Sequence, residues 1–135
     1  MADFFVWNPK TLALNVPSMD DEHKILIHKM NALHAAHAKG ADRGTLGKLL
    51  TDLASYTRDH FADEERYMAS VKYSGLDVHK LIHQRLLAQF GEHAASFEKS
   101  GKLSDAFFSF LSFWLTSHIQ GIDMQYATAP AKRAS

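Results

Sequence analysis

The sequence contains no cysteine, and this absence removes a large part of the chemistry open to a protein. Disulfides, thiolate zinc sites, iron–sulfur clusters and nucleophilic thiols are all excluded. A metal bound to this chain would therefore be held by nitrogen and oxygen atoms alone.

Three further absences narrow the class of protein. The 15 basic and 15 acidic side chains cancel, so no net charge attracts the chain to nucleic acid or anionic lipid. No segment reaches the roughly 18 consecutive apolar residues of a membrane span. The N-terminus also lacks the basic stretch and long apolar run of a signal peptide. We therefore expect a cytoplasmic protein that binds neither nucleic acid nor membrane.

No segment shows the alternation of a strand, whereas apolar residues recur at three- and four-residue spacing in four segments. These segments extend from Ser18 to Gly40, from Leu46 to Tyr67, from Leu76 to Gly101 and from Phe107 to Gly121. Ala41 to Gly44 are expected to form a short connection. The pattern predicts one all-α domain over residues 1–135, an up-down-up-down antiparallel four-helix bundle over 18–121. An N-terminal loop (1–17) precedes it, and a C-terminal segment (122–135) follows.

The fourth predicted helix is unusually apolar. Its polar residues form a narrow line, and phenylalanines such as Phe110 and Phe113 fill much of the rest. Deep burial is the favoured interpretation of this pattern, and a subunit interface or partner surface is the alternative.

Histidine is unusually frequent in this sequence, with nine residues in the chain. Five of the nine lie on the apolar stripes of the four predicted helices: His23, His60, His79, His83 and His118. One such histidine is more often a hydrogen-bonded core residue than a ligand. Five imidazoles left unpaired in one core would cost about 1–3 kcal/mol per group, and a metal would satisfy their nitrogens directly.

The spacing of these residues supports a shared site. His79 and His83 are four residues apart, so their rings project from one helical face a turn apart. His60 and Glu64 stand in the same relation, and a carboxylate on an apolar stripe requires a positive partner. The alternative is that Glu64 is a partly exposed residue near a helix end, with Glu65 as an ordinary surface acid. We favour the ligand role, because Glu64 is in register with His60.

Asp123 follows His118 by five residues, which is not a helical repeat. For both to reach one site, the helix must unwind between them, and Gly121 is suited to allow it. By itself this spacing is a weak signal. Together with the other six ligands it makes Asp123 a candidate.

The seven donors indicate which metals fit. Five imidazoles and two carboxylates suit iron, zinc, copper or manganese better than calcium or magnesium. Seven ligands are too many for one ion and suit two, with the carboxylates as bridges. Two octahedral ions that share both carboxylates and one bridging oxygen atom, and that bind the five imidazoles, have one coordination position left open, which favours binding of a small diatomic molecule.

At this point the sequence resembles the hemerythrin family, and its bacterial branch in particular. The motifs are D-D-E-H at residues 20–23, H-F-A-D-E-E at 60–65, H-K-L-I-H at 79–83 and W-L-T-S-H-I-Q-G-I-D at 114–123. The resemblance extends from Trp7 to Tyr126, and all seven ligand positions of the family are filled.

The resemblance implies a non-haem pair of iron ions. The histidines would divide into one set of His79, His83 and His118 and another of His23 and His60. Glu64 and Asp123 would bridge the ions, together with a solvent-derived oxo or hydroxo group. Dioxygen would bind reversibly at the two-histidine iron, for carriage, storage or delivery of oxygen. The expected function is therefore binding and not catalysis.

Reversible binding requires a dry pocket, and the family pattern places apolar residues around it. The candidates lie within one helical turn of a ligand: Leu26, Phe61, Trp114, Leu115 and Ile119. Their role as plain bundle core is equally compatible. Tyr126 would support the site from behind the ligands, or would only pack at the bundle end.

Two other functions remain open. The same domain could sense oxygen, redox state or nitric oxide, although no signalling domain accompanies it in these 135 residues. A di-iron oxidase is disfavoured, because carboxylate-rich bundles use Glu-x-x-His pairs, and the nearest match here is Asp20-x-x-His23. The sequence indicates no partner protein.

The remaining four histidines are not expected to bind the metal pair. His28 falls off the apolar stripe and is predicted to face solvent. His34, His37 and His93 are predicted to lie behind the ligands or at a polar rim.

Overall fold

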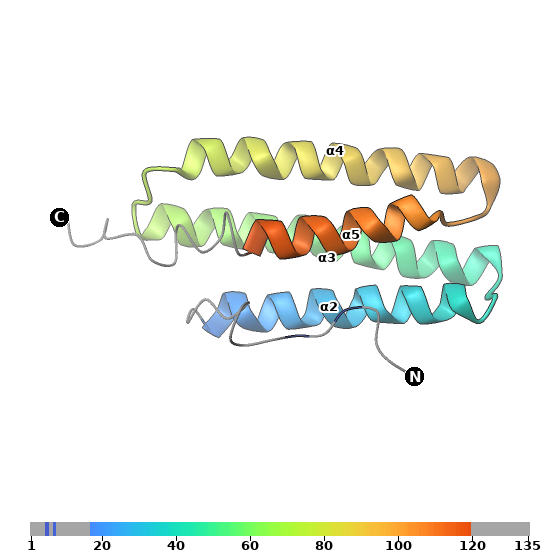
Figure 1. The fold of residues 1–135 in the computed structure, drawn as a ribbon. Coiled ribbons are helices and arrows are strands. Elements are labelled where there is room, and N and C mark those ends of the chain that lie inside the picture. Colours follow the sequence, from blue (N-terminus) through green and yellow to red (C-terminus); the bar gives the residue numbers. More distant parts are fainter. Residues whose placement is uncertain (1–4, 6, 8–16, 120–135) are drawn as a thin grey trace.

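The computed structural model describes Phe5, Trp7 and residues 17–119. Four helices make up most of this range: α2 (Pro17–Ala38), α3 (Arg43–Ser70), α4 (Leu76–Ser100) and α5 (Asp105–Ser117). They lie side by side, and successive helices run in opposite directions (Figure 1). The prediction of an all-α four-helix bundle is confirmed. Within the described range, no helix combines the length and the apolar character needed to cross a lipid bilayer.

The glycines that the sequence marks as helix ends adopt left-handed backbone conformations. Gly40 has φ +77° and Gly101 has φ +73°. After α2, the N–H of Gly40 donates to the carbonyl of His37 at 3.1 Å, and that of Ala41 donates to the carbonyl of Ala36 at 3.0 Å. This pair of bonds is a Schellman motif, in which glycine carries no steric penalty.

The start of α3 differs from the prediction. The Asp42 carboxylate accepts a hydrogen bond of 2.7 Å from the backbone N–H of Thr45 and so caps the helix. The helix therefore begins at Arg43 and includes Gly44, and the predicted connection from Ala41 to Gly44 is too long. A capping bond of this kind outweighs the low helix propensity of one glycine.

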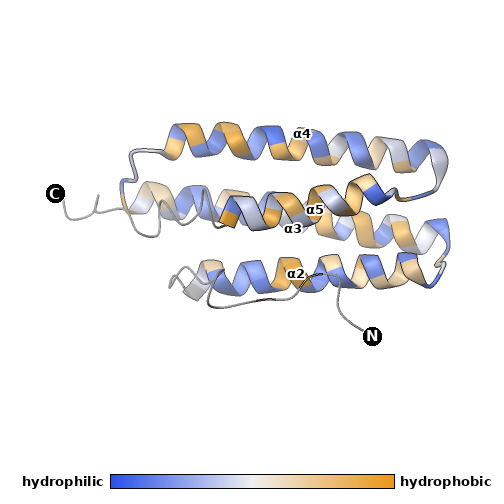
Figure 2. Ribbon diagram, in the orientation of Figure 1, coloured by the Kyte–Doolittle hydropathy of each residue, from blue (hydrophilic) through white to orange (hydrophobic). Residues whose placement is uncertain are grey.

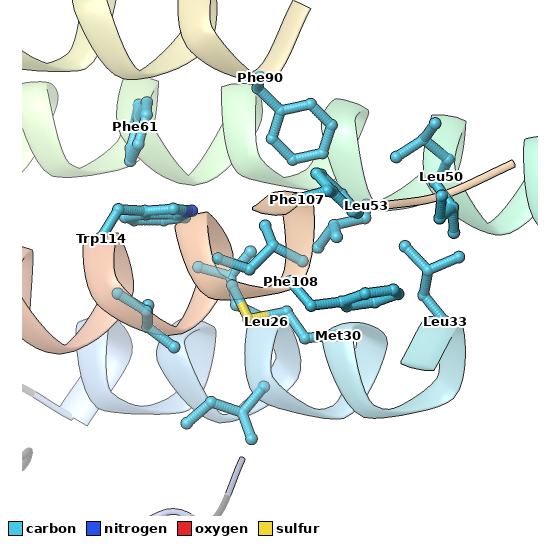
Figure 3. Close-up of a cluster of buried hydrophobic side chains, with 14 of the residues drawn as sticks. Leu26, Met30, Leu33, Leu50, Leu53, Phe61, Phe90, Phe107, Phe108 and Trp114 are labelled. Atoms are coloured by element: carbon cyan, nitrogen blue, oxygen red, sulfur yellow. The ribbon is translucent and has the colours of Figure 1, made fainter. Parts of the chain in front are cut away.

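A continuous apolar core runs along the bundle between the helices (Figures 2 and 3). Each helix contributes buried side chains: Leu26, Met30 and Leu33 from α2, Leu50, Leu53 and Phe61 from α3, Phe90 and Phe97 from α4, and Phe107 and Leu111 from α5. Burial of each such side chain is worth about 1.5–3 kcal/mol. The backbone of α3 approaches those of α2 and α4 most closely.

The expectation of deep burial holds for only one face of α5. Its buried residues are Phe107, Phe108, Leu111, Trp114 and Leu115. Phe113 is 73% exposed, and Ser109 and Ser117 are exposed beside it. Residues four apart share a helix face, so Phe113 falls in line with these serines.

Candidate metal centre

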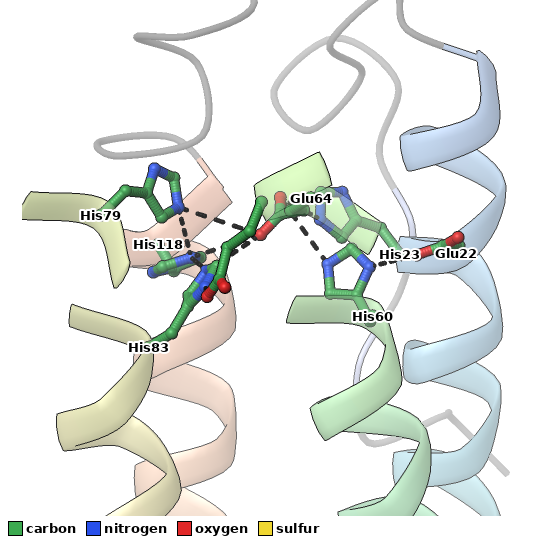
Figure 4. A network of polar contacts seen from close by, with 8 residues as sticks. Glu22, His23, His60, Glu64, His79, His83 and His118 are labelled. Carbon is green, nitrogen blue, oxygen red and sulfur yellow. Dashed lines mark hydrogen bonds and ion pairs between the residues drawn. The ribbon is translucent and has the colours of Figure 1, made fainter. Parts of the chain in front are cut away.

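The five histidines from the apolar stripes gather at one end of the bundle (Figure 4). In an antiparallel bundle, the starts of α2 and α4 meet the ends of α3 and α5 at this end. Each ring is at most 3% exposed, and they come from all four helices: His23 from α2, His60 from α3, His79 and His83 from α4, and His118 from the end of α5. The structure thus brings together every predicted histidine ligand.

The fully buried carboxylate of Glu64 lies among these rings. Its Oε1 atom is 3.0 Å from Nε2 of His83, 3.8 Å from Nε2 of His118 and 3.9 Å from Nε2 of His79. The three Nε2 atoms also face one another, with His118 3.2 Å from His83 and 3.3 Å from His79. One carboxylate oxygen and three imidazole nitrogens therefore form a group of metal-ligand size.

The other oxygen of Glu64 faces a second, smaller group. Its Oε2 atom is 3.7 Å from Nε2 of His23 and 3.7 Å from Nε2 of His60. These atoms again lie close enough to hold one ion. Glu64 thus separates the histidines into a set of three and a set of two, with one oxygen toward each.

Glu64 is poised to act as a charged ligand. Burial alone would raise the pKa of its carboxyl, but the surrounding histidines, His60 foremost, hold that pKa well below its usual range. The carboxylate is therefore ionised in the core, as metal ligation requires.

Two further carboxylates hold the outer nitrogens of ligand histidines. Glu22 Oε1 lies 2.6 Å from Nδ1 of His60, and Glu65 Oε2 lies 2.8 Å from Nδ1 of His83. An ionised carboxylate only accepts, so each Nδ1–H donates and each Nε2 presents its lone pair to the interior. In His83 that lone pair faces Glu64 Oε1 at 3.0 Å. Two acceptors this close require a cation or a second ring proton between them.

Glu65 is therefore not an ordinary surface acid, and the sequence did not reveal its contact. Its side chain is 28% exposed and contacts a ligand ring on the neighbouring helix. Spacing within a helix reveals neighbours on that helix only, so it gave no signal for a bond between α3 and α4. The one available signal was adjacency to the ligand Glu64.

The five predicted pocket residues are all buried next to the ligands. Leu26, Leu115 and Ile119 have no exposed surface. Phe61 stacks flat on His83, with ring centroids 3.8 Å apart and planes 2° apart, and lies 5.9 Å from His60. Trp114 lies 5.6 Å from Phe61 and 5.8 Å from His118, centroid to centroid. The aromatic pair thus packs mainly on the three-histidine side, and a role around dioxygen stays a prediction.

Asp123 and Tyr126 lie outside the described residues, so their roles also stay predictions. At His118 and Ile119, the last described residues, the helix widens into a π-type turn.

The remaining histidines lie away from this centre. His28 is exposed, as predicted. His34 and His37 pack against Phe108, with centroids 4.9 and 5.1 Å away. His93 lies 5.1 Å from the ring of Phe110. In the described part of the chain, these four belong to none of the groups that could hold a metal.

Bundle and site together define a four-helix protein with a buried, histidine-rich site that could hold metal ions. Residues 15–129 match the family model described as the hemerythrin HHE cation binding domain. The chain belongs to the hemerythrin family.

Relatives and solved structures agree with this assignment. A myohemerythrin of Riftia pachyptila is 36% identical over 122 residues, which make up 90% of each chain. A bacteriohemerythrin of Stenotrophomonas maltophilia (strain R551-3) is 31% identical over 90% of this chain and 78% of its own. A crystal structure of wild-type hemerythrin superposes with a TM-score of 0.85 at 29% identity, over 95% of this chain and 97% of the other.

Proposed function

We propose that this chain binds dioxygen reversibly at a pair of non-haem iron ions, and that it carries, stores or delivers oxygen. The donor set fits two ions, because five imidazole nitrogens surround the two oxygens of one buried carboxylate. When bound, the iron pair would supply the electrons that dioxygen binding requires. The names of the relatives, bacteriohemerythrin and myohemerythrin, support iron over the other metals that these donors suit.

The residues for the two ions follow from the position of Glu64. His79, His83 and His118 would hold one ion with Glu64 Oε1, and His23 and His60 would hold the other with Oε2. Asp123 would be the second bridging carboxylate, beside an oxo or hydroxo group from solvent. The uneven division of histidines is the observation that carries the proposal, because it leaves the two-histidine ion with room for a small molecule.

The surroundings of the site favour reversible binding over catalysis. Leu26, Leu115 and Ile119 are fully buried within one helical turn of candidate ligands, and they would keep water and proton donors from the site. Among the described residues, Glu64 is the only carboxylate in the two ligand groups. A carboxylate-rich oxidase site would require several more.

The test is an anaerobic titration of the iron-loaded, reduced protein with dioxygen. We expect about two iron ions per chain and an absorption band that appears with dioxygen and disappears on purging with argon. The matched control is His28→Ala, which removes an exposed histidine and should leave the band unchanged.

Three results would contradict the proposal. Iron content well below a pair would remove the centre itself. A reduced protein whose spectrum does not respond to dioxygen would not be a carrier. Continuous consumption of dioxygen with a reductant and an organic substrate would identify an oxidase instead.

A further inference from the structure

Two partly exposed carboxylates contact the ligand histidines from outside the metal groups. Glu22 is 19% exposed and holds Nδ1 of His60 at 2.6 Å, and Glu65 is 28% exposed and holds Nδ1 of His83 at 2.8 Å. In Figure 4, Glu22 lies on the far side of the His60 ring from Glu64. These distances are typical of charge-assisted hydrogen bonds.

The two bonds are distributed one to each histidine set. His60 belongs to the two-histidine group and His83 to the three-histidine group. Each bond also joins two helices, since Glu22 of α2 reaches His60 of α3, and Glu65 of α3 reaches His83 of α4. Both metal positions would therefore have one ligand ring that is oriented and polarised by a negative charge.

Such a bond changes what the imidazole does as a ligand. A carboxylate that accepts from Nδ1–H fixes the tautomer and increases the electron density on Nε2, so the ring becomes a stronger donor. A stronger donor stabilises ferric iron more than ferrous iron. Because dioxygen binding draws electrons from the metal pair, the same effect tightens the binding of dioxygen.

We propose that Glu22 and Glu65 are positioning residues that lower the reduction potential of the iron pair, Glu22 on the two-histidine side and Glu65 on the three-histidine side. The link to dioxygen affinity rests on the proposed function. The effect on potential does not, because it is measured without dioxygen.

Two pairs of variants separate charge from position. Glu22→Gln and Glu65→Gln keep a hydrogen-bond acceptor but remove the charge, whereas Glu22→Ala and Glu65→Ala remove both. The matched controls are Asp21→Asn and Asp63→Asn, each of which removes one negative charge nearby. Asp21 is the exposed residue before Glu22, and Asp63 is partly exposed and pairs with Arg66. Neither control residue belongs to the ligand groups.

The main measurement is the reduction potential of the iron-loaded protein, taken by spectroelectrochemistry under argon. We expect each Gln variant to load iron normally and to favour the ferrous state about tenfold, a rise of about 59 mV for a one-electron couple. The metal–imidazole vibrations in resonance Raman spectra should shift with it. Each Ala variant should in addition release iron to a chelator about 10–100 times faster. The two controls should match the wild type in all three measurements.

Each other outcome counts against the proposal. If the Gln variants keep the wild-type potential while the Ala variants lose iron, the carboxylates only orient the rings, and the tuning role is overturned. If the controls shift the potential as much as the Gln variants, the cause is general surface charge. Because the two carboxylates contact rings of different histidine groups, either single Gln variant decides the question for its group. A wild type that fails to bind dioxygen would overturn the proposed function but leave these tests intact.

Discussion

At the scale of single residues, Glu64 explains the most about this molecule. A fully buried carboxylate is strongly destabilising unless positive charge or hydrogen bonds compensate it. Here the Nε2 atoms of five histidines lie within 3.9 Å of its oxygens. Such an arrangement adds little stability to a bundle core that apolar residues could fill, and its donor atoms fit a site for metal ions.

Replacing Glu64 should therefore remove both metal positions together. Glu64→Ala deletes the one carboxylate among the described residues that faces both histidine groups, and we expect iron affinity to fall by more than about 100-fold, beyond the effect of losing an outer partner. Iron analysis after gel filtration measures this. His28→Ala should retain full iron content, and an iron-replete Glu64→Ala protein would contradict the assignment.

Trp114 offers a second test at the residue scale. It is 4% exposed, and within the described range nothing accepts a hydrogen bond from its indole Nε1. A buried donor without an acceptor costs about 1–3 kcal/mol, and this cost cancels part of the stability that the larger indole ring contributes by packing. Trp114→Phe should therefore change the free energy of unfolding by less than about 1.5 kcal/mol. Trp114→Ala should lose about 3–5 kcal/mol.

Chemical denaturation of the metal-free protein gives both free energies. A Trp114→Phe variant as unstable as Trp114→Ala would show that the indole N–H has a partner after all. The comparison also checks whether this predicted pocket residue serves first as core.

The residues of the site differ in how far the sequence could predict them. His23, His60, His79, His83, His118 and Glu64 share the period of the apolar stripes, so helical periodicity alone brings them to one core. Glu22 and Glu65 were missed because each contacts a ring on another helix. That contact depends on how helices are rotated against each other, which spacing within one helix does not encode.

At the scale of elements, the local signals predicted where most helices end. Gly40 and Gly101 both adopt the left-handed conformation that stops a helix. The errors arose where two signals compete. Gly44 was taken as part of a connection, yet the cap from Asp42 begins α3 before it. Phe113 was assigned to the buried face, although its position on α5 is exposed.

The Asp42 cap of α3 should make the folding stability of the protein depend on pH. The backbone N–H and then the side chain of Thr45 donate to Asp42 and lower the pKa of its carboxyl. In the unfolded chain the pKa of an Asp carboxyl is near 3.9, and in the folded protein the pKa of Asp42 is lower. The ionised cap therefore stabilises the fold above the unfolded-state pKa, and this stabilisation is lost as the pH falls through the folded-state pKa. The gap in thermal midpoint between wild type and Asp42→Ala should therefore be largest near neutral pH and shrink below about pH 4.

Two further variants isolate the charge. Asp42→Asn keeps a capping oxygen, so its midpoint should exceed that of Asp42→Ala at every pH, without the acid-dependent part. Ser104 caps α5 by accepting from the N–H of Phe107 at 3.1 Å and does not titrate. The effect of Ser104→Ala should thus be independent of pH, and equal acid dependence for both caps would refute the argument.

At the scale of the whole molecule, the bundle has two ends of different character. One end holds the histidines and Glu64, and the rest of its length is filled by apolar residues such as Leu33, Leu53 and Phe97. The apolar part needs no metal. The division is visible along the chain, because the histidines occupy the stripes near the starts of α2 and α4 and toward the ends of α3 and α5.

Removal of iron by a chelator should therefore weaken the bundle without unfolding it. Binding to the folded state alone stabilises by about 4 kcal/mol at a thousandfold excess over Kd, and loss of that term lowers the thermal midpoint. The far-UV circular dichroism should keep its helical signal.

The loss of stability should concentrate in α5, which has 13 residues and joins the proposed metal centre through His118 at its end. Hydrogen exchange should accelerate there more than around Leu53 of α3, whose helix packs closely against both α2 and α4. Glu64→Ala supplies the matched reference, since its thermal midpoint should change little when iron is added. A stripped protein that loses its helical signal would mean that the metal, and not the apolar core, holds these four helices together.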